Sequence, residues 1–187
     1  TGTMQMSGIV EGQRFVPNIA FQPLGFLIFV VAISAELNRA PFDLLEAESE
    51  LVTGFHTEYS GMKWAIVQMA EYAAIIGFSG VIAALFLSGW KGPFILPGYI
   101  WFVLKIGFVI SVFIWVRATI PRLRVDQIMG LGWKFLLPLA LVNLFVMAVE
   151  VVAYPEGLPE WLIPVNLAIA GVALVTATRL VKFPGER

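Results

Sequence analysis

Six carboxylates and one arginine are concentrated in a short segment, residues 36–59, which reads ELNRAPFDLLEAESELVTGFHTEY. The acids are Glu36, Asp43, Glu46, Glu48, Glu50 and Glu58, and the base is Arg39. Pro41 suits the first turn of a helix, on which Asp43, Glu46 and Glu50 would share one face. Carboxylates crowded beside a region of low dielectric raise one another's pKa, so they exchange protons nearer neutral pH. The segment is therefore predicted to hold and pass protons.

A second interpretation of this segment is a solvated acidic helix in a surface loop. Two observations count against it. Apolar residues are interleaved with the acids, which favours packing over free solvation. The segment also lies directly between two long apolar runs, which would hold it at a membrane surface.

Glu71 is an isolated acid within a long apolar run. It lies eight residues beyond Lys63, or about 12 Å along a helix. An unpaired carboxylate at that depth costs at least a few kcal/mol, so Glu71 is expected to be neutral, paired or facing a hydrated interior. It either forms a proton relay with Glu36 or bonds a neighbouring helix as a neutral carboxyl. Lys105 and Glu150 lie nearer the ends of their runs, where snorkelling to the interface accounts for them.

The third feature is basic. Residues 117–138 read RATIPRLRVDQIMGLGWKFLLP and carry Arg117, Arg122, Arg124 and Lys134. These cations either keep the loop in the cytoplasm or form a docking surface for an anionic partner or for the acidic loop. The spacing does not separate the two interpretations.

Composition indicates which elements position these groups. Apolar residues make up 59% of the chain and charged residues 13%, against about 45–50% and about 25% in soluble domains. The apolar runs are continuous rather than alternating, so an all-α, polytopic transmembrane bundle is predicted as one domain, residues 1–187. The predicted spans are residues 15–36, 62–90, 97–117, 133–153 and 161–179, and the loops of interest are residues 37–61, with short helices, and 118–132.

The distribution of Lys and Arg predicts the orientation of these spans. One side receives Arg39, Lys63, Arg117, Arg122, Arg124, Lys134, Arg179, Lys182 and Arg187. The other side receives only Arg14 and Lys91. Cytoplasmic loops carry the excess of cations, so the acidic loop, the basic loop and the C-terminus are predicted to be cytoplasmic.

Several classes of site are excluded or disfavoured. The chain has no cysteine, which rules out disulfides and thiolate-ligated iron–sulfur clusters within it. His56 is the only histidine, and no metal site is predicted. The formal net charge is −1, so nucleic acid is not an expected partner.

Two long motifs resemble one family of membrane proteins. The first is NRAPFDLLEAESELVTGFHTEYSGMK, followed by MAEY around Glu71. The second is LK at residues 104–105 followed by WVRATIPRLRVDQIMGLGWKFLLP, and SGIVEGQ near the start also fits. These residues resemble the H subunit of proton-pumping NADH:quinone oxidoreductase (respiratory complex I), which is subunit 1 in mitochondrial naming. The similarity reaches about residue 153 and indicates the C-terminal half of the family's chain. The last span looks like the nine-helix version, and Leu45 stands where Pro is frequent.

The resemblance implies a role for each motif residue. Glu36 and Glu71 would belong to an acidic proton path. Arg39, Phe42 and Asp43 would border a quinone chamber. The remaining loop acids, Glu46, Glu48, Glu50 and Glu58, would line the same region. Arg117, Arg122, Arg124 and Asp126 would face the hydrophilic arm.

The same resemblance implies partners and cofactors. Quinone would bind jointly with hydrophilic-arm subunits, while FMN and iron–sulfur clusters would be held only in those partners. Small membrane subunits, antiporter-like subunits and lipid would complete the surroundings. The location would be a bacterial cell membrane or the mitochondrial inner membrane.

Three other functions are considered. Membrane-bound hydrogenases and formate hydrogenlyases contain a homologous subunit without quinone chemistry; the full set of loop acids and HTEYS favour the quinone enzyme. A stand-alone ion transporter would use Glu71 and Lys105 as an intramembrane pair. A purely structural membrane anchor does not need an acid such as Glu71 within an apolar span, so Glu71 counts against this function.

Overall fold

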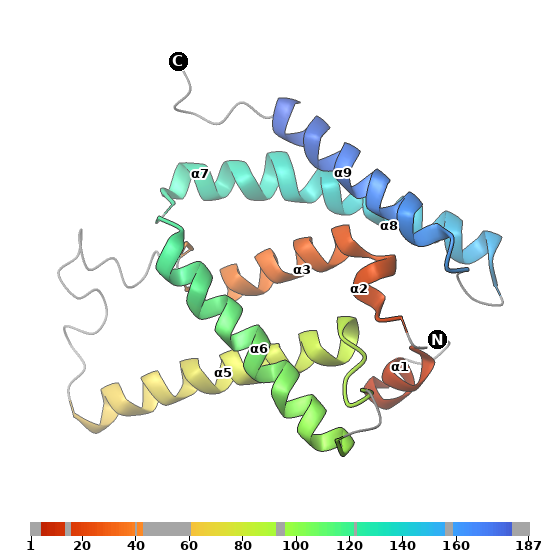
Figure 1. Ribbon diagram of the computed structural model, residues 1–187. Coiled ribbons are helices and arrows are strands. Elements are labelled where there is room, and N and C mark those ends of the chain that lie inside the picture. The colour runs from red at the N-terminus through yellow and green to blue at the C-terminus, as the bar shows by residue number, and fades with distance from the viewer. Residues whose placement is uncertain are drawn as a thin grey trace. The chain divides into compact units, whose positions relative to one another are not determined.

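Long apolar runs form helices along most of the chain in the computed structural model (Figure 1). The structure describes residues 5–13, 16–39, 41–42, 61–92, 96–121, 123–155 and 159–180. The helices are α1 (Met6–Gly12), α2 (Asn18–Phe21), α3 (Pro23–Glu36), α5 (Met62–Phe86), α6 (Gly98–Thr119), α7 (Val125–Gly130), the π-helical turn η2 (Leu131–Leu136), α8 (Leu137–Ala153) and α9 (Leu162–Leu180). No strand occurs in these described ranges, and the predicted all-α class is confirmed.

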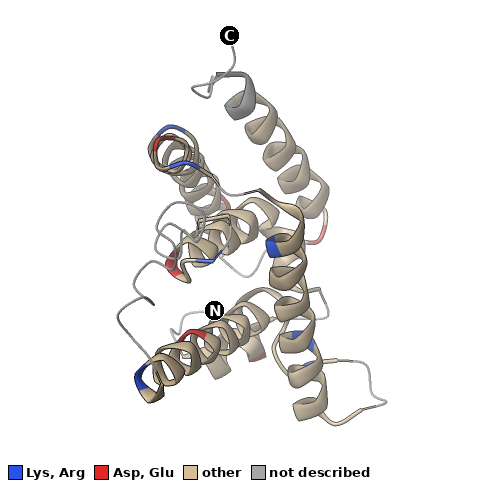
Figure 2. Ribbon diagram, turned by 90° about the vertical axis from the view of Figure 1, so that its left-hand side faces the viewer, with Lys and Arg blue, Asp and Glu red and all other residues tan. Residues whose placement is uncertain are grey.

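The helices are those of an integral membrane protein. Those long and apolar enough to cross a bilayer are Met62–Phe86, Gly98–Thr119 and the continuous Val125–Ala153, and shorter apolar helices are Pro23–Glu36 and Leu162–Thr176. Large apolar side chains are exposed on the long helices, as at Met69 (71%) and Val152 (81%). Such faces are unfavourable in water but suit lipid or partner helices. Figure 2 shows Lys, Arg, Asp and Glu as isolated bands on otherwise uncharged helices.

The chain divides into two compact units, each described by itself. Unit 1 comprises Thr1–Val16 and Val30–Arg122, and unit 2 comprises Pro17–Phe29 and Leu123–Arg187. In unit 1, α6 and α1 both pack on α5. Gly80 lies at the α5–α6 contact, where a small residue lets two membrane helices approach closely.

The core of unit 2 is built from α3, η2, α8 and α9. Its buried members are Leu24, Phe135, Leu139 and Ala170. Partly buried apolar side chains of the same helices pack around them. Because these residues come from the beginning and the end of the chain, the last helix is part of this core rather than an appendage.

The first predicted span, residues 15–36, is divided in the structure. Helix α2 ends at Phe21, and Gln22 has φ −130° and ψ 59°, outside the helical region. The cause is Pro23, because a proline disfavours the helical conformation of the residue before it. The continuous helix α3 therefore has 14 residues, which is shorter than the roughly 20 that cross a bilayer.

The helix of the fourth predicted span begins earlier than expected, at Val125 rather than Trp133. Part of the predicted loop 118–132 is thus helical. The helix widens at η2, where the Leu137 N–H bonds the Gly132 carbonyl five residues back. Pro138 follows at once and has no N–H to continue the regular pattern. Such π-helical turns insert one extra residue without ending a helix.

Candidate functional site

An ion pair joins the end of α3 to the middle of α5 within unit 1. Arg39 Nη2 lies 3.0 Å from Glu71 Oε2, and the two side chains are 11% and 25% exposed. The Arg39 guanidinium carbon also lies 5.2 Å from the centre of the Tyr72 ring, a cation–π distance. The intramembrane acid is therefore paired, one of the three states expected for it.

Local backbone structure directs Arg39 towards α5. Helix α3 ends at Glu36, and the Leu37 N–H still bonds the Ile33 carbonyl at 2.9 Å. Asn38 follows with φ +47°, a left-handed conformation that asparagine tolerates after a helix. The Phe42 N–H then bonds the Arg39 carbonyl at 2.8 Å, which closes a tight turn.

Of the other predicted proton-path and chamber residues, the structure describes Glu36 and Phe42. Glu36 is exposed at the last position of α3, while Phe42 is buried, at 7% exposure. The remaining acids of the loop lie outside the described residues: Asp43, Glu46, Glu48, Glu50 and Glu58. The structure brings Arg39 to Glu71, whereas the sequence suggested Glu36 as the neighbour of Glu71. The functional roles of all these residues remain predictions.

The predicted partner-facing residues are exposed where the structure describes them. Arg117 lies in the last turn of α6, where a cation complements the helix dipole. Asp126 lies in the first turn of α7, where an anion does the same. Arg124 precedes α7, and its N–H donates to Gln127 Oε1 at 3.0 Å. Arg122 is outside the described residues.

The C-terminal end of α5 is held by side chains that the sequence did not single out. Gln13 Nε2 donates to the Ala84 and Leu85 carbonyls at 2.8 and 3.1 Å. Gln13 Oε1 accepts the Ser88 N–H at 2.9 Å. The carbonyls at a helix end have no partner within the helix, so Gln13 acts as a cap from a distant part of the chain. Gln13 is the last residue of the SGIVEGQ motif, so this motif contributes the residue that caps α5.

Lys105 binds the same helix end. Its Nζ donates to the carbonyls of Leu87, Gly89 and Lys91 at 2.5, 2.9 and 2.6 Å. These bonds use all three donors of the ammonium group. The ammonium group of Lys105 therefore binds main-chain carbonyls just beyond the C-terminal end of α5, and its snorkelling to the interface stays a prediction.

Lys105→Met is expected to lower the stability of the assembled protein by about 2 kcal/mol or more, because three carbonyls lose a charged donor at once. Thermal unfolding of the purified complex measures this. Lys63→Met is the control, because Lys63 is an exposed lysine at the start of α5. Equal melting temperatures for the two variants would contradict a capping role for Lys105.

Gly89→Ala is expected to destabilise the same region by about 1–3 kcal/mol. Gly89 has φ +49°, and an added Cβ would lie 2.7 Å from a methyl of the fully buried Val10. Gly107→Ala on α6 is the matched control, because a Cβ there meets nothing within 4 Å. Thermal unfolding that ranks the two variants in the opposite order would contradict this packing.

In unit 2, Glu150 departs from the snorkelling expectation. It is buried, at 7% exposure, and its Oε2 accepts a bond from Asn166 Nδ2 at 3.2 Å. A carboxyl that snorkelled would place its oxygens in water. The prediction was wrong because the partner lies on α9, in a part of the chain that local hydropathy does not connect to α8.

No group of three or more His, Cys, Asp and Glu side chains in the described part of the chain is arranged to hold a metal ion. His56 lies outside that part.

These features define a polytopic, all-helical membrane protein in which a carboxylate on a spanning helix pairs with an arginine from the turn after α3. Residues 1–148 match the NADH dehydrogenase family, and the chain belongs to that family. Over all 187 residues it is 49% identical to the H subunit of NADH-quinone oxidoreductase from Dehalococcoides mccartyi (strain 195), covering 52% of that relative. It is 52% identical over 151 residues to the corresponding protein of Anoxybacillus flavithermus, covering 79% of this chain and 45% of that one. The chain thus spans about half the length of the curated relatives it matches.

Proposed function

We propose that this chain is a membrane subunit of a proton-translocating NADH:quinone oxidoreductase. It would form part of the quinone chamber and the acidic path that links quinone reduction to proton movement. Family membership and the names of the relatives support the enzyme class. The observation that carries the mechanism is the Arg39–Glu71 ion pair.

The pair connects two parts of the chain that the mechanism needs to couple. Arg39 lies in the acidic segment, four residues before Asp43, and Glu71 lies on spanning helix α5. A movement of the acids that follow Arg39, or a change in their charge, would act on Arg39 because only a few residues separate them. If Arg39 withdraws, Glu71 loses this ion pair in a membrane span, which costs free energy unless the carboxylate is compensated by another group or by a proton. The pair is therefore suited to convert a change in the loop into a change of charge in the membrane.

The proton-coupled reaction supplies that change. Conversion of a quinone to a quinol takes up two electrons and two protons, so carboxyl groups beside the chamber that give up protons become carboxylates and must be reprotonated. FMN and iron–sulfur clusters in partner subunits would deliver the electrons from NADH. Within this chain, Arg39, Phe42 and Asp43 would border the quinone. The acids Glu46, Glu48, Glu50 and Glu58 would exchange protons beside it, and Glu36 and Glu71 would continue the path.

Partner contacts and sidedness follow from the distribution of charge. Arg117, Arg122, Arg124 and Asp126 would meet the hydrophilic arm at the cytoplasmic face. Small membrane subunits and antiporter-like subunits would cover apolar helix faces. The acidic loop and the C-terminus would be cytoplasmic, as the excess of cations on that side favours. The membrane would be a bacterial cell membrane or its mitochondrial equivalent.

The contacts of Glu71 and Lys105 weigh against a stand-alone transporter. That function required the two residues to pair within the membrane. Instead Glu71 binds Arg39, and the three donors of Lys105 are taken by carbonyls. A subunit of a membrane-bound hydrogenase would differ in the soluble subunits that it binds. Purification with its partners distinguishes that function from the proposed one.

Affinity purification of the tagged full-length protein from its own membranes tests the proposal. The expected result is co-purification of subunits that carry flavin and iron–sulfur clusters, with NADH:quinone activity that quinone-site inhibitors block. Co-purification with a hydrogenase or formate-oxidising subunit would overturn the quinone assignment. Isolation of this chain alone with ion flux in vesicles would overturn the whole proposal.

A further inference from the structure

The turn of residues 87–91, which follows α5 in unit 1, brings three main-chain carbonyls around one nitrogen atom. The carbonyl oxygens of Leu87, Gly89 and Lys91 lie 2.5, 2.9 and 2.6 Å from Lys105 Nζ. They belong to alternate residues of the turn, and Lys105 reaches them from the neighbouring helix α6. The turn therefore forms a compact group of carbonyl acceptors that an ammonium group occupies.

Hydrogen bonds within the main chain hold the turn in this shape. The N–H groups of Leu87 and Gly89 both donate to the Ala83 carbonyl, at 3.2 and 2.8 Å. The Lys91 N–H donates to the Ser88 carbonyl at 2.9 Å. These bonds direct the N–H groups of the turn towards the end of α5 and into the turn itself. The alternate carbonyls are thereby directed to Lys105.

Support for the turn also comes from the segment that contains α1. Ser88 and Gly89 have φ values of +60° and +49°. A left-handed conformation is uncommon for serine, so contacts outside the turn must stabilise it. The Ser88 N–H donates to Gln13 Oε1 at 2.9 Å, and the Val10 side chain lies against Gly89. The packing of α1 on α5 thus supports the shape of the turn independently of Lys105.

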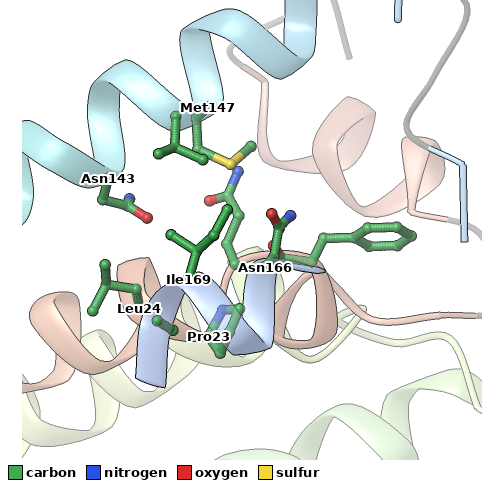
Figure 3. Close-up of a pocket in the computed structure, with 10 residues that line it drawn as sticks. Pro23, Leu24, Asn143, Met147, Asn166 and Ile169 are labelled. Carbon is green, nitrogen blue, oxygen red and sulfur yellow. The ribbon is translucent and has the colours of Figure 1, made fainter. Parts of the chain in front are cut away.

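Three carbonyls around one point require three donors on one atom. A lysine ammonium group has three N–H donors, whereas a side-chain amide has two. Asn166, beside the small pocket of unit 2 (Figure 3), illustrates the amide. Its Nδ2 donates to one carbonyl, that of Phe21, at 2.8 Å and to Glu150 Oε2 at 3.2 Å. An amide nitrogen in place of Lys105 Nζ would leave one carbonyl of the turn without a donor.

We propose that the turn of residues 87–91 is a binding site for a primary ammonium group and that Lys105 is its built-in ligand. A cap that acts only through the helix dipole needs a positive charge near the helix end. This site needs, in addition, three N–H donors on one nitrogen. It therefore selects a primary alkylammonium ion over a quaternary ammonium ion of the same charge. Lys105 is partly exposed, which gives a small ion access to the site. The proposal does not depend on the proposed function.

Chemical rescue of Lys105→Ala in the intact complex tests this. The variant lacks the side chain beyond Cβ, and the n-propylammonium ion consists of the same missing atoms. Lys105→Ala should have a lower melting temperature than the wild type, and n-propylammonium chloride should raise it towards the wild-type value. Tetramethylammonium chloride at the same concentration supplies the charge without an N–H donor and should not restore it. Lys63→Ala removes an exposed lysine at the start of α5, so the two salts should affect it equally.

Equal stabilisation of Lys105→Ala by the two salts would overturn the proposal, because charge alone would then account for the effect. Failure of n-propylammonium to stabilise the variant would overturn it as well. A high-resolution cryo-electron microscopy map of the wild-type complex needs no variant. The map should place Lys105 Nζ within about 3.2 Å of all three carbonyl oxygens. A Lys105 side chain directed away from the turn would contradict the site even if Lys105→Ala does not assemble.

Discussion

Glu71→Gln is expected to lower NADH:quinone turnover and the coupled proton pumping by about 100-fold, the scale on which a positioned proton-transfer group acts. Glutamine keeps the size and the hydrogen-bonding oxygen of the side chain but neither carries a negative charge nor releases a proton. Assembly should survive, because an uncharged amide costs less in a membrane span than a carboxylate. Turnover and pumping in proteoliposomes measure the effect.

The control for this change is Glu150→Gln. Glu150 is also an acid on an apolar helix, but it is bonded to the neutral Asn166 and has no charged partner in the described part of the chain. Glutamine keeps an acceptor for Asn166, so activity should stay near the wild-type level. Glu36→Gln should resemble Glu71→Gln if both belong to one path. Full activity in Glu71→Gln and Glu36→Gln would remove these acids from the mechanism.

Arg39→Met is expected to abolish most turnover and also to destabilise the protein by about 1–3 kcal/mol, because the partly buried ion pair loses its cation while the carboxylate remains. Arg39→Lys should retain part of the activity, since the charge remains but the planar contact with Tyr72 is lost. Turnover and thermal unfolding of the complex measure the two effects.

A double-mutant cycle separates coupling from simple damage. Arg39→Met with Glu71→Gln removes both charges of the pair, so the double variant should be more stable than Arg39→Met alone. Its activity should fall no further than that of the worse single variant. Strictly additive losses in stability and activity would mean that the two residues act independently.

Most of the helical architecture could be predicted because one local property, continuous apolar sequence, determines it. The helices of α5, α6, α8 and α9 lie within or close to the predicted spans. The break at Gln22 was missed because hydropathy is insensitive to the backbone restriction imposed by Pro23. The early start of the fourth helix was missed because glycines and cations are typical of loops. In the structure Gly130 lies in α7, and Gly132 and Lys134 lie in η2.

The candidate site was predicted less completely, because its contacts join distant residues. Glu71 stood out as an acid in an apolar run, and Arg39 as the base of the acidic segment. That they bind each other depends on the turn at Asn38, which pattern analysis does not reveal. Gln13 was missed for the same reason, since its partners lie more than 70 residues away.

We propose that the Arg39–Glu71 pair opens and closes with the redox state of the quinone. Structures of the intact complex with oxidised quinone, and again during NADH-driven turnover, measure the Nη2–Oε2 distance directly. The account predicts a distance near the present 3.0 Å in one state and beyond about 4 Å, the limit for an ion pair, in the other. An unchanged distance in all states would contradict it.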